Sequence, residues 1–102
     1  MTNRPLFDTL RFWSDDAPHS PAWNMAEDQA WLEATPQPML RVYRWEQPAV
    51  SIGYAQRLDK LADALPALPL VRRWTGGGVV FHGQDATYSL IVPARVEWAS
   101  LN

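Results

Sequence analysis

Residues 70–83 read Leu70-Val71-Arg72-Arg73-Trp74-Thr75-Gly76-Gly77-Gly78-Val79-Val80-Phe81-His82-Gly83, with two arginines before three consecutive glycines and one histidine after them. Three glycines remove every Cβ from a short segment, so a ligand can lie on main-chain N–H groups and a positive φ has no steric cost. The paired arginines add fixed positive charge and planar donors that suit carboxylate or phosphate. The stretch predicts a binding site for a small anion, and the alternative is a flexible hairpin connection.

Strands are expected on both sides of this glycine loop, which we define as residues 75–78. In residues 39–46, apolar Leu40 and Val42 alternate with Arg41, Tyr43 and Trp45, a pattern typical of a half-buried strand. Similar patterns, bounded by proline, glycine and asparagine or aspartate, predict strands at 6–13, 39–46, 49–52, 70–74, 79–82 and 86–92.

A helix is predicted to begin at Ser20-Pro21, because a hydroxyl cap followed by proline is a favourable first turn. Helical spacing gives it an apolar face, made of Trp23, Ala26, Ala30, Trp31 and Ala34. Three acids lie off that face and predict a solvent-exposed acidic side, namely Glu27, Asp28 and Glu33. A second, short helix is expected at 58–65, and residues 96–102 resemble the start of another.

The order of these elements predicts an α+β domain with a mostly antiparallel or mixed sheet and flanking helices. The chain has 102 residues, enough for one small domain. Because the helix-like segment 96–102 stops before any packing face repeats, the domain is expected to be incomplete at its C-terminus.

Composition narrows the possible functions. The net charge of −2 gives no reason to expect nonspecific binding to nucleic acid or to an anionic membrane. The chain has no cysteine, so it forms no disulfide and no thiolate metal site, and we expect no metal site. The sequence shows no signal peptide and no membrane-spanning stretch, which indicates a cytoplasmic protein.

Three motifs, in this order, resemble those of the lipoate–protein ligases, which are part of the biotin and lipoate ligase superfamily. They are Trp23-Asn24-Met25-Ala26-Glu27-Asp28, Val50-Ser51-Ile52-Gly53-Tyr54-Ala55-Gln56 and the arginine–glycine stretch 72–82. The resemblance implies a fold like that of these ligases, with residues 1–102 as the N-terminal portion of a single catalytic domain.

The resemblance also implies a reaction. Members of the family use ATP, with Mg²⁺, to convert lipoate to lipoyl-adenylate, and they transfer the lipoyl group to a lysine. The acceptors would be lipoyl domains of 2-oxoacid dehydrogenases or the glycine-cleavage H protein. The catalytic lysine of the family would lie beyond Asn102, and a second chain could complete the domain.

Residue roles carried over from the family fall into two sets. The expected ATP-binding residues are Arg73, Gly78, Val79, Val80 and Phe81. The expected lipoyl- or adenylate-binding residues are Arg72, Thr75, Gly76, Gly77, His82, Trp45, Asn24 and Gly53.

Structural alternatives to these roles stay open. Arg72 and Arg73 alternate along a strand, so one of them could be an ordinary surface cation. His82 could be a hydrogen-bonded strand histidine, Asn24 could bond only to backbone, and Phe81 and Trp45 could be core residues.

Two other functions fit the same residues. Octanoyltransferases share the fold and use a downstream cysteine or lysine, so the motifs above do not separate a transferase from a ligase. A non-catalytic piece that binds a ligand or a partner is the third possibility.

Overall fold

The computed structural model describes residues 8–93. Its elements in chain order are β1 (Arg11–Ser14), α1 (Pro21–Ala34), β2 (Met39–Arg44), β3 (Ala49–Ile52), α2 (Leu58–Leu61) with the 3₁₀ turn η1 (Ala62–Ala64), β4 (Leu70–Arg72), β5 (Val80–His82) and β6 (Ala86–Ile91). The helix expected at 96–102 and the first residues of the strand expected at 6–13 lie outside the described residues. The other expected elements are present with ends shifted by a few residues.

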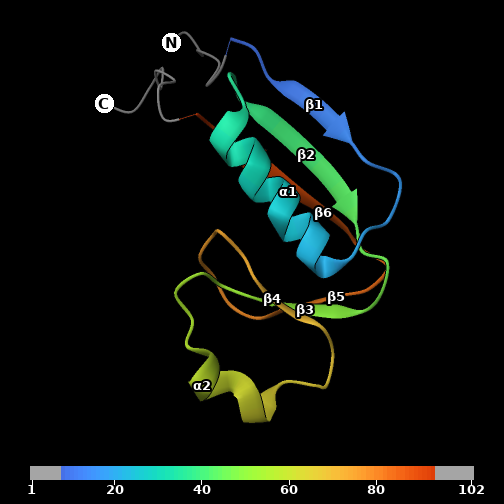
Figure 1. Cartoon of the computed structure of the whole chain (residues 1–102), viewed down its shortest axis with the longest axis vertical. Coiled ribbons are helices and arrows are strands. Elements are labelled where there is room, and N and C mark those ends of the chain that lie inside the picture. Colours follow the sequence, from blue (N-terminus) through green and yellow to red (C-terminus); the bar gives the residue numbers. More distant parts are fainter. Residues whose placement is uncertain (1–7, 94–102) are drawn as a thin grey trace, which may run out of the picture.

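The described strands form two three-stranded sheets, ordered β1-β2-β6 and β4-β3-β5 (Figure 1). Each sheet is mixed: β1 runs parallel to β2 and β4 runs parallel to β3, whereas β2–β6 and β3–β5 are antiparallel pairs. The expected α+β class with mixed pairing is confirmed. The strands are divided between two sheets, however, and do not share one.

The division has a local cause. Strands β2 and β3 on one side, and β5 and β6 on the other, form one long antiparallel ribbon that bends between the Arg44–Ala86 and Ala49–His82 pairs. Pro48 lies in one connecting segment and Gly83 in the other. Proline cannot donate a hydrogen bond to a strand ladder and glycine weakens the ladder. The ladder therefore breaks at Pro48 and Gly83, in both arms of the ribbon.

Helix α1 lies across one face of the β1-β2-β6 sheet, while α2 lies at the far end of the second sheet (Figure 1). The predicted start of α1 is confirmed, since the Ser20 hydroxyl accepts a 3.1 Å hydrogen bond from the Trp23 N–H and proline occupies the first turn. The predicted apolar face is not the one that the sheet covers. Asn24 and Met25 are buried, whereas Trp23, Ala26 and Ala30 are exposed.

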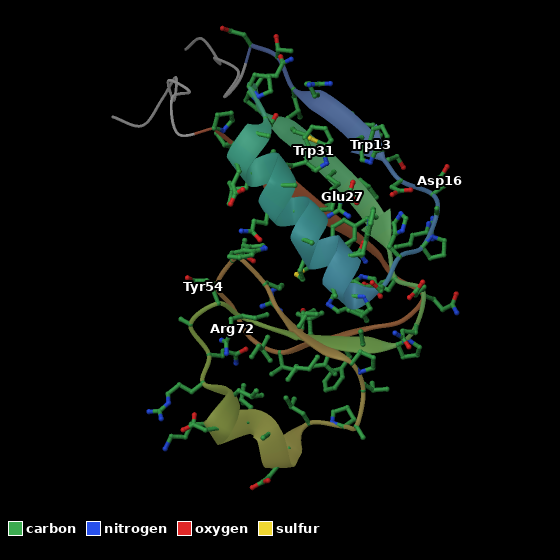
Figure 2. The ribbon with its side chains drawn as sticks, viewed as in Figure 1. Trp13, Asp16, Glu27, Trp31, Tyr54 and Arg72 are labelled. Carbon is green, nitrogen blue, oxygen red and sulfur yellow. The ribbon has the colours of Figure 1, made fainter. Side chains whose placement is uncertain are left out.

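The acidic side of α1 is also not the solvated face that the sequence predicts. Glu27 and Asp28 bind Arg41 of β2, at 3.1 Å and 2.7 Å, and their side chains are only 19% and 14% exposed. The Arg41 side chain is fully buried, and its guanidinium lies 3.9 Å from the centre of the Tyr43 ring. A buried guanidinium needs carboxylate partners, which is why these acids face inward. Figure 2 shows Glu27 between helix and sheet. Glu33 stays exposed, as expected.

A small apolar cluster joins the two sheets at the bend of the ribbon. It contains Met25, Tyr43, Trp45 and Ala49, with Val71 packed against it. Within residues 8–93, no helix is both long and apolar enough to cross a membrane.

Candidate glycine-loop site

The glycine loop packs directly on the end of β3. A Cβ added to Gly53 would overlap the carbonyl oxygen of Gly77. Gly77 itself has a φ of +102°, a backbone conformation that residues other than glycine rarely adopt. A Cβ at Gly76 or Gly78 would meet no atom within 4 Å. At its Cα, the middle glycine is therefore packed closely against other protein atoms, whereas the Cα atoms of the outer two glycines border open space.

Arg73 holds this loop in place. Its Nη2 donates to the carbonyl oxygens of Gly76 at 3.2 Å and Gly78 at 2.7 Å, and its Nη1 donates to the Ser51 hydroxyl at 2.7 Å. These acceptors are all neutral. Within residues 8–93, Arg73 forms no ion pair with a carboxylate, in contrast to Arg41 and Arg57. The positive charge of a half-buried guanidinium thus stays unneutralised beside the loop.

Arg72 has a different set of partners. It lies beside Ile52 in the β3–β4 ladder, and its Nη1 donates to three carbonyl oxygens, those of Gly53 (3.3 Å), Tyr54 (3.0 Å) and Gln56 (2.6 Å). Figure 2 shows Arg72 and Tyr54 together at one end of the second sheet. Arg72 therefore fixes the turn that follows β3, whereas Arg73 fixes the glycine loop.

His82 is buried next to the loop's anchor. Its Nε2 lies 2.8 Å from the Ser51 hydroxyl, and its ring stacks on Trp45 with centroids 4.0 Å apart and planes inclined by 17°. Trp45 is itself buried, which matches the core alternative for this residue. The neighbouring Phe81 is 62% exposed and pairs with Val50, one position along the ladder from Ser51, so it lies on the other face of the sheet.

The structure brings together part of the predicted site set. Arg73 and the glycine loop are joined through Ser51 to His82 and Trp45, and Gly53 supports Gly77 from below. Three predicted residues lie elsewhere: Asn24, Arg72 and Phe81. Val80 pairs with Ser51 in the ladder, so it lies on the same face of the sheet as Ser51 and His82. Thr75 accepts a 2.8 Å bond from the Tyr54 N–H, and Val79 is half-buried.

Asn24 belongs to the contact between helix and first sheet. Its side-chain nitrogen donates to the Arg44 carbonyl at 3.0 Å, and its side-chain oxygen accepts from Arg41 at 3.2 Å. It is completely buried, and both ends of its amide are used, so it joins α1 to β2.

Sequence reasoning gave no role to Ser51, although this residue connects Arg73 to His82. The sequence did contain a signal for Ser51, because it is the one hydroxyl residue in the otherwise apolar segment 49–52. Among residues 8–93, no group of three or more histidine, cysteine, aspartate or glutamate side chains is arranged to hold a metal ion.

The chain is similar in sequence to known proteins. Residues 20–101 match the sequence family described as the lipoyl protein ligase A/B catalytic domain. The chain is 46% identical over 81 residues to the octanoyltransferase LipM of Anoxybacillus flavithermus, which aligns 72% of the chain with 29% of that protein. It is 38% identical over 91 residues to the octanoyltransferase LipM of Oceanobacillus iheyensis, with 81% of the chain and 33% of that protein aligned.

The chain thus spans about a third of the length of these curated relatives. The matched region includes α1, the end of β3 and the whole glycine loop, so the site geometry and the family match concern the same residues. The chain belongs to the family of lipoyl protein ligase A/B catalytic domains.

Proposed function

We propose that this chain supplies the acyl-substrate site of an octanoyl- or lipoyltransferase, with residues 1–102 as the N-terminal portion of a single catalytic domain. The acyl group would pass from a carrier-protein thioester to a lysine of a lipoyl domain. The supporting observation is the glycine loop, with open space at Gly76 and Gly78, beside Arg73, which pairs with no carboxylate of residues 8–93. The names of the relatives, which are octanoyltransferases, favour transfer over ATP-dependent ligation.

The chemistry of acyl transfer suits such a loop. When a nucleophile adds to the thioester carbonyl, negative charge develops on its oxygen, and fixed donors at that point lower the barrier. The bonds from Arg73 hold the loop by the carbonyls of Gly76 and Gly78. In this proposal the N–H groups of the loop bind the substrate. The C–S bond breaks as the lysine amide forms, and the amine proton leaves with the thiol or to solvent. We assign no nucleophile to residues 1–102.

The residue roles follow from this proposal. Arg73 with Gly76, Gly77 and Gly78 would bind the anionic part of the substrate. Val79 and the exposed side chain of Val80 would line the path of the acyl chain. Gly53, Trp45 and Thr75 would support the site from behind. Arg72 would hold the turn after β3, and Asn24 would act only by joining α1 to β2.

ATP-dependent activation of lipoate is the second candidate, because an unneutralised guanidinium beside glycine N–H groups also suits a phosphate. In that reaction Arg73, Gly78, Val79, Val80 and Phe81 would contact ATP with its Mg²⁺. The two candidates differ in a single requirement, the nucleotide.

The test is an acylation assay with a lipoyl domain as acceptor, run on the full-length protein. One arm supplies an octanoyl thioester of acyl carrier protein without ATP, and the other supplies ATP, Mg²⁺ and free lipoate or octanoate. We expect product in the first arm only. Product only with ATP would establish the ligase, and absence of product in both arms would overturn an enzymatic role for the site.

Arg73→Ala should lower kcat/KM by about 10- to 100-fold, the range for a lost charge-assisted contact. Arg57→Ala is the matched control, since Arg57 is 69% exposed and pairs only with Asp59 on the surface. Equal losses in the two variants would contradict a special role for Arg73.

A further inference from the structure

His82 is held at both ring nitrogens. Its Nε2 meets the Ser51 hydroxyl at 2.8 Å, and its Nδ1 lies 3.1 Å from Oδ2 of Asp85 in the turn between β5 and β6. The side chain of His82 is only 4% exposed. Since Ser51 also accepts from Arg73, the four residues Asp85, His82, Ser51 and Arg73 form a continuous hydrogen-bonded chain, which we call the positioning chain.

Two hydrogen-bond directions in the positioning chain follow from chemistry, those at its two charged ends. The guanidinium of Arg73 can only donate, so Ser51 accepts from it, and the Ser51 hydroxyl also hydrogen-bonds to Nε2 of His82. A carboxylate can only accept, so His82 donates from Nδ1 to Asp85. Both ring nitrogens are thus engaged by neighbouring side chains, and neither is left for a substrate.

The carboxylate end of the chain is held by further donors. The backbone N–H of Gly83 donates to Oδ1 of Asp85 at 2.7 Å, and the Thr87 hydroxyl donates to Oδ2 at 3.1 Å. Trp45, which stacks on His82, donates from its indole nitrogen to the Thr87 hydroxyl at 2.8 Å. Burial opposes the ionisation of Asp85, but the bonds from Gly83, His82 and Thr87 outweigh it and lower the pKa of this carboxyl.

We propose that Asp85, His82 and Ser51 are positioning residues, which orient Arg73 and through it the carbonyls of Gly76 and Gly78, and that His82 transfers no proton in the reaction. The inference about catalysis rests on the proposed function of the glycine loop. The structural part, that Asp85 controls the loop through three intervening residues, does not depend on any activity.

The first experiment observes the residues of the positioning chain directly by NMR, without substrate. In the parent protein, the ring nitrogens of His82 should show the Nδ1-protonated tautomer. Asp85→Asn replaces an acceptor with a group that can donate to Nδ1, so the tautomer should change and the amide resonances of Gly76, Gly77 and Gly78 should move. Asp59→Asn, at a carboxylate that is 61% exposed, is the control and should leave those glycine resonances unchanged.

Ser51→Ala interrupts the positioning chain at the residue next to Arg73. It replaces Asp85→Asn as the test if the Asp85 variant does not fold. It should move the same glycine resonances while Asp85 stays in place. Unchanged glycine resonances in either folded variant would overturn the proposal.

The second experiment separates positioning from proton transfer. If the chain positions Arg73, Asp85→Asn should raise KM for the acyl thioester about tenfold and leave the pH profile of kcat unchanged. If His82 is instead the general base, the acidic limb of the kcat profile should shift, and the proposal is wrong. In Ser51→Ala, where the chain is already cut, adding Asp85→Asn should have no further effect on KM. A parent protein without transferase activity would refute the proposed function, whereas the glycine resonances would still decide the structural part.

Discussion

Two arginines, one in the first sheet and one directly after β4 of the second sheet, have different roles in this protein. Arg41 in the β1-β2-β6 sheet is fully buried and faces two carboxylates, those of Glu27 and Asp28. Arg73, which follows β4 of the second sheet, binds carbonyl and hydroxyl oxygens and no carboxylate in the part of the chain that the structure describes. The first charge is neutralised inside the protein and the second is not.

The difference teaches that the partners, rather than the degree of burial alone, decide what an arginine does. A guanidinium matched by carboxylates stabilises the fold and attracts no outside anion. A guanidinium held by neutral oxygens keeps its position and also its charge, so it can bind an anionic ligand. The first sheet is thus a support and the second carries the candidate site.

The largest effect is expected from removing the neutralised arginine. Arg41→Met would leave Glu27 and Asp28 as half-buried, unpaired carboxylates, so the free energy of unfolding should fall by about 3–5 kcal/mol. Urea denaturation measures this. Arg57→Met, which breaks the exposed pair with Asp59, should cost no more than about 1 kcal/mol. Similar losses in the two variants would break the comparison.

A second effect on stability, similar in size to the one at alkaline pH below, concerns the packing of the glycine loop. Gly53→Ala places a methyl group against the Gly77 carbonyl, so the loop must move, and we expect a loss of about 1–3 kcal/mol in stability. The control is Gly83→Ala, because a Cβ there meets nothing within 4 Å. Urea denaturation of both proteins is the measurement, and a Gly53→Ala protein as stable as the Gly83→Ala protein would contradict the close contact.

Alkaline pH should weaken the first sheet selectively. Burial, aided by the nearby Asp28 carboxylate, raises the pKa of Tyr43 to about 12. Because the folded state favours the neutral phenol, its contribution is complete below the unfolded pKa of about 10 and is lost as the pH rises toward 12. At about 1.4 kcal/mol per pKa unit, the loss is about 2–3 kcal/mol.

Tyr43→Phe cannot ionise and should show a flatter fall in stability between about pH 10 and 12. Tyr88→Phe, at a tyrosine that is 72% exposed, should behave like the parent protein. Urea midpoints measured across this pH range give the result, and parallel curves for Tyr43→Phe and the parent would rule out the effect.

The smallest effect is expected at the connection between the two regions. The indole N–H of Trp74 donates to the Met25 carbonyl of α1 at 3.0 Å, next to the glycine loop. Trp74→Phe keeps most of the ring and removes this bond, so stability should fall by about 1 kcal/mol. Thermal unfolding detects this, and a loss as large as that of Arg41→Met would show that the two regions are not separable.

Local signals in the sequence predicted much of the fold. Ser20 and Pro21 act within one turn of their own positions, so the start of α1 could be read directly. The strand at residues 49–52 was likewise predicted with correct ends. The bend that divides the sheet was not predicted, because it depends on Pro48 and Gly83 meeting at one level of a ribbon, which is a matter of register between distant strands.

The sequence pointed to the glycines of the candidate site, but it did not reveal the hydrogen bonds that connect the other residues of the site. Gly76 and Gly78 border open space, as their lack of side chains suggests, but no pattern revealed that Asp85 reaches His82. The inward turn of Glu27 and Asp28 was missed for a related reason: their partner Arg41 lies in another element, and helical periodicity describes only one element at a time.

The bent ribbon restricts how sequences of this kind can vary in length. Successive strand residues point to opposite faces, so inserting one residue between β2 and β3 without a compensating change between β5 and β6 would shift the ladder by one position. Ser51 would then lie on the opposite face of the sheet from His82, and the positioning chain would be cut between these two residues. Insertions and deletions at these two connections should therefore be tolerated only in pairs, whatever the amino acids involved.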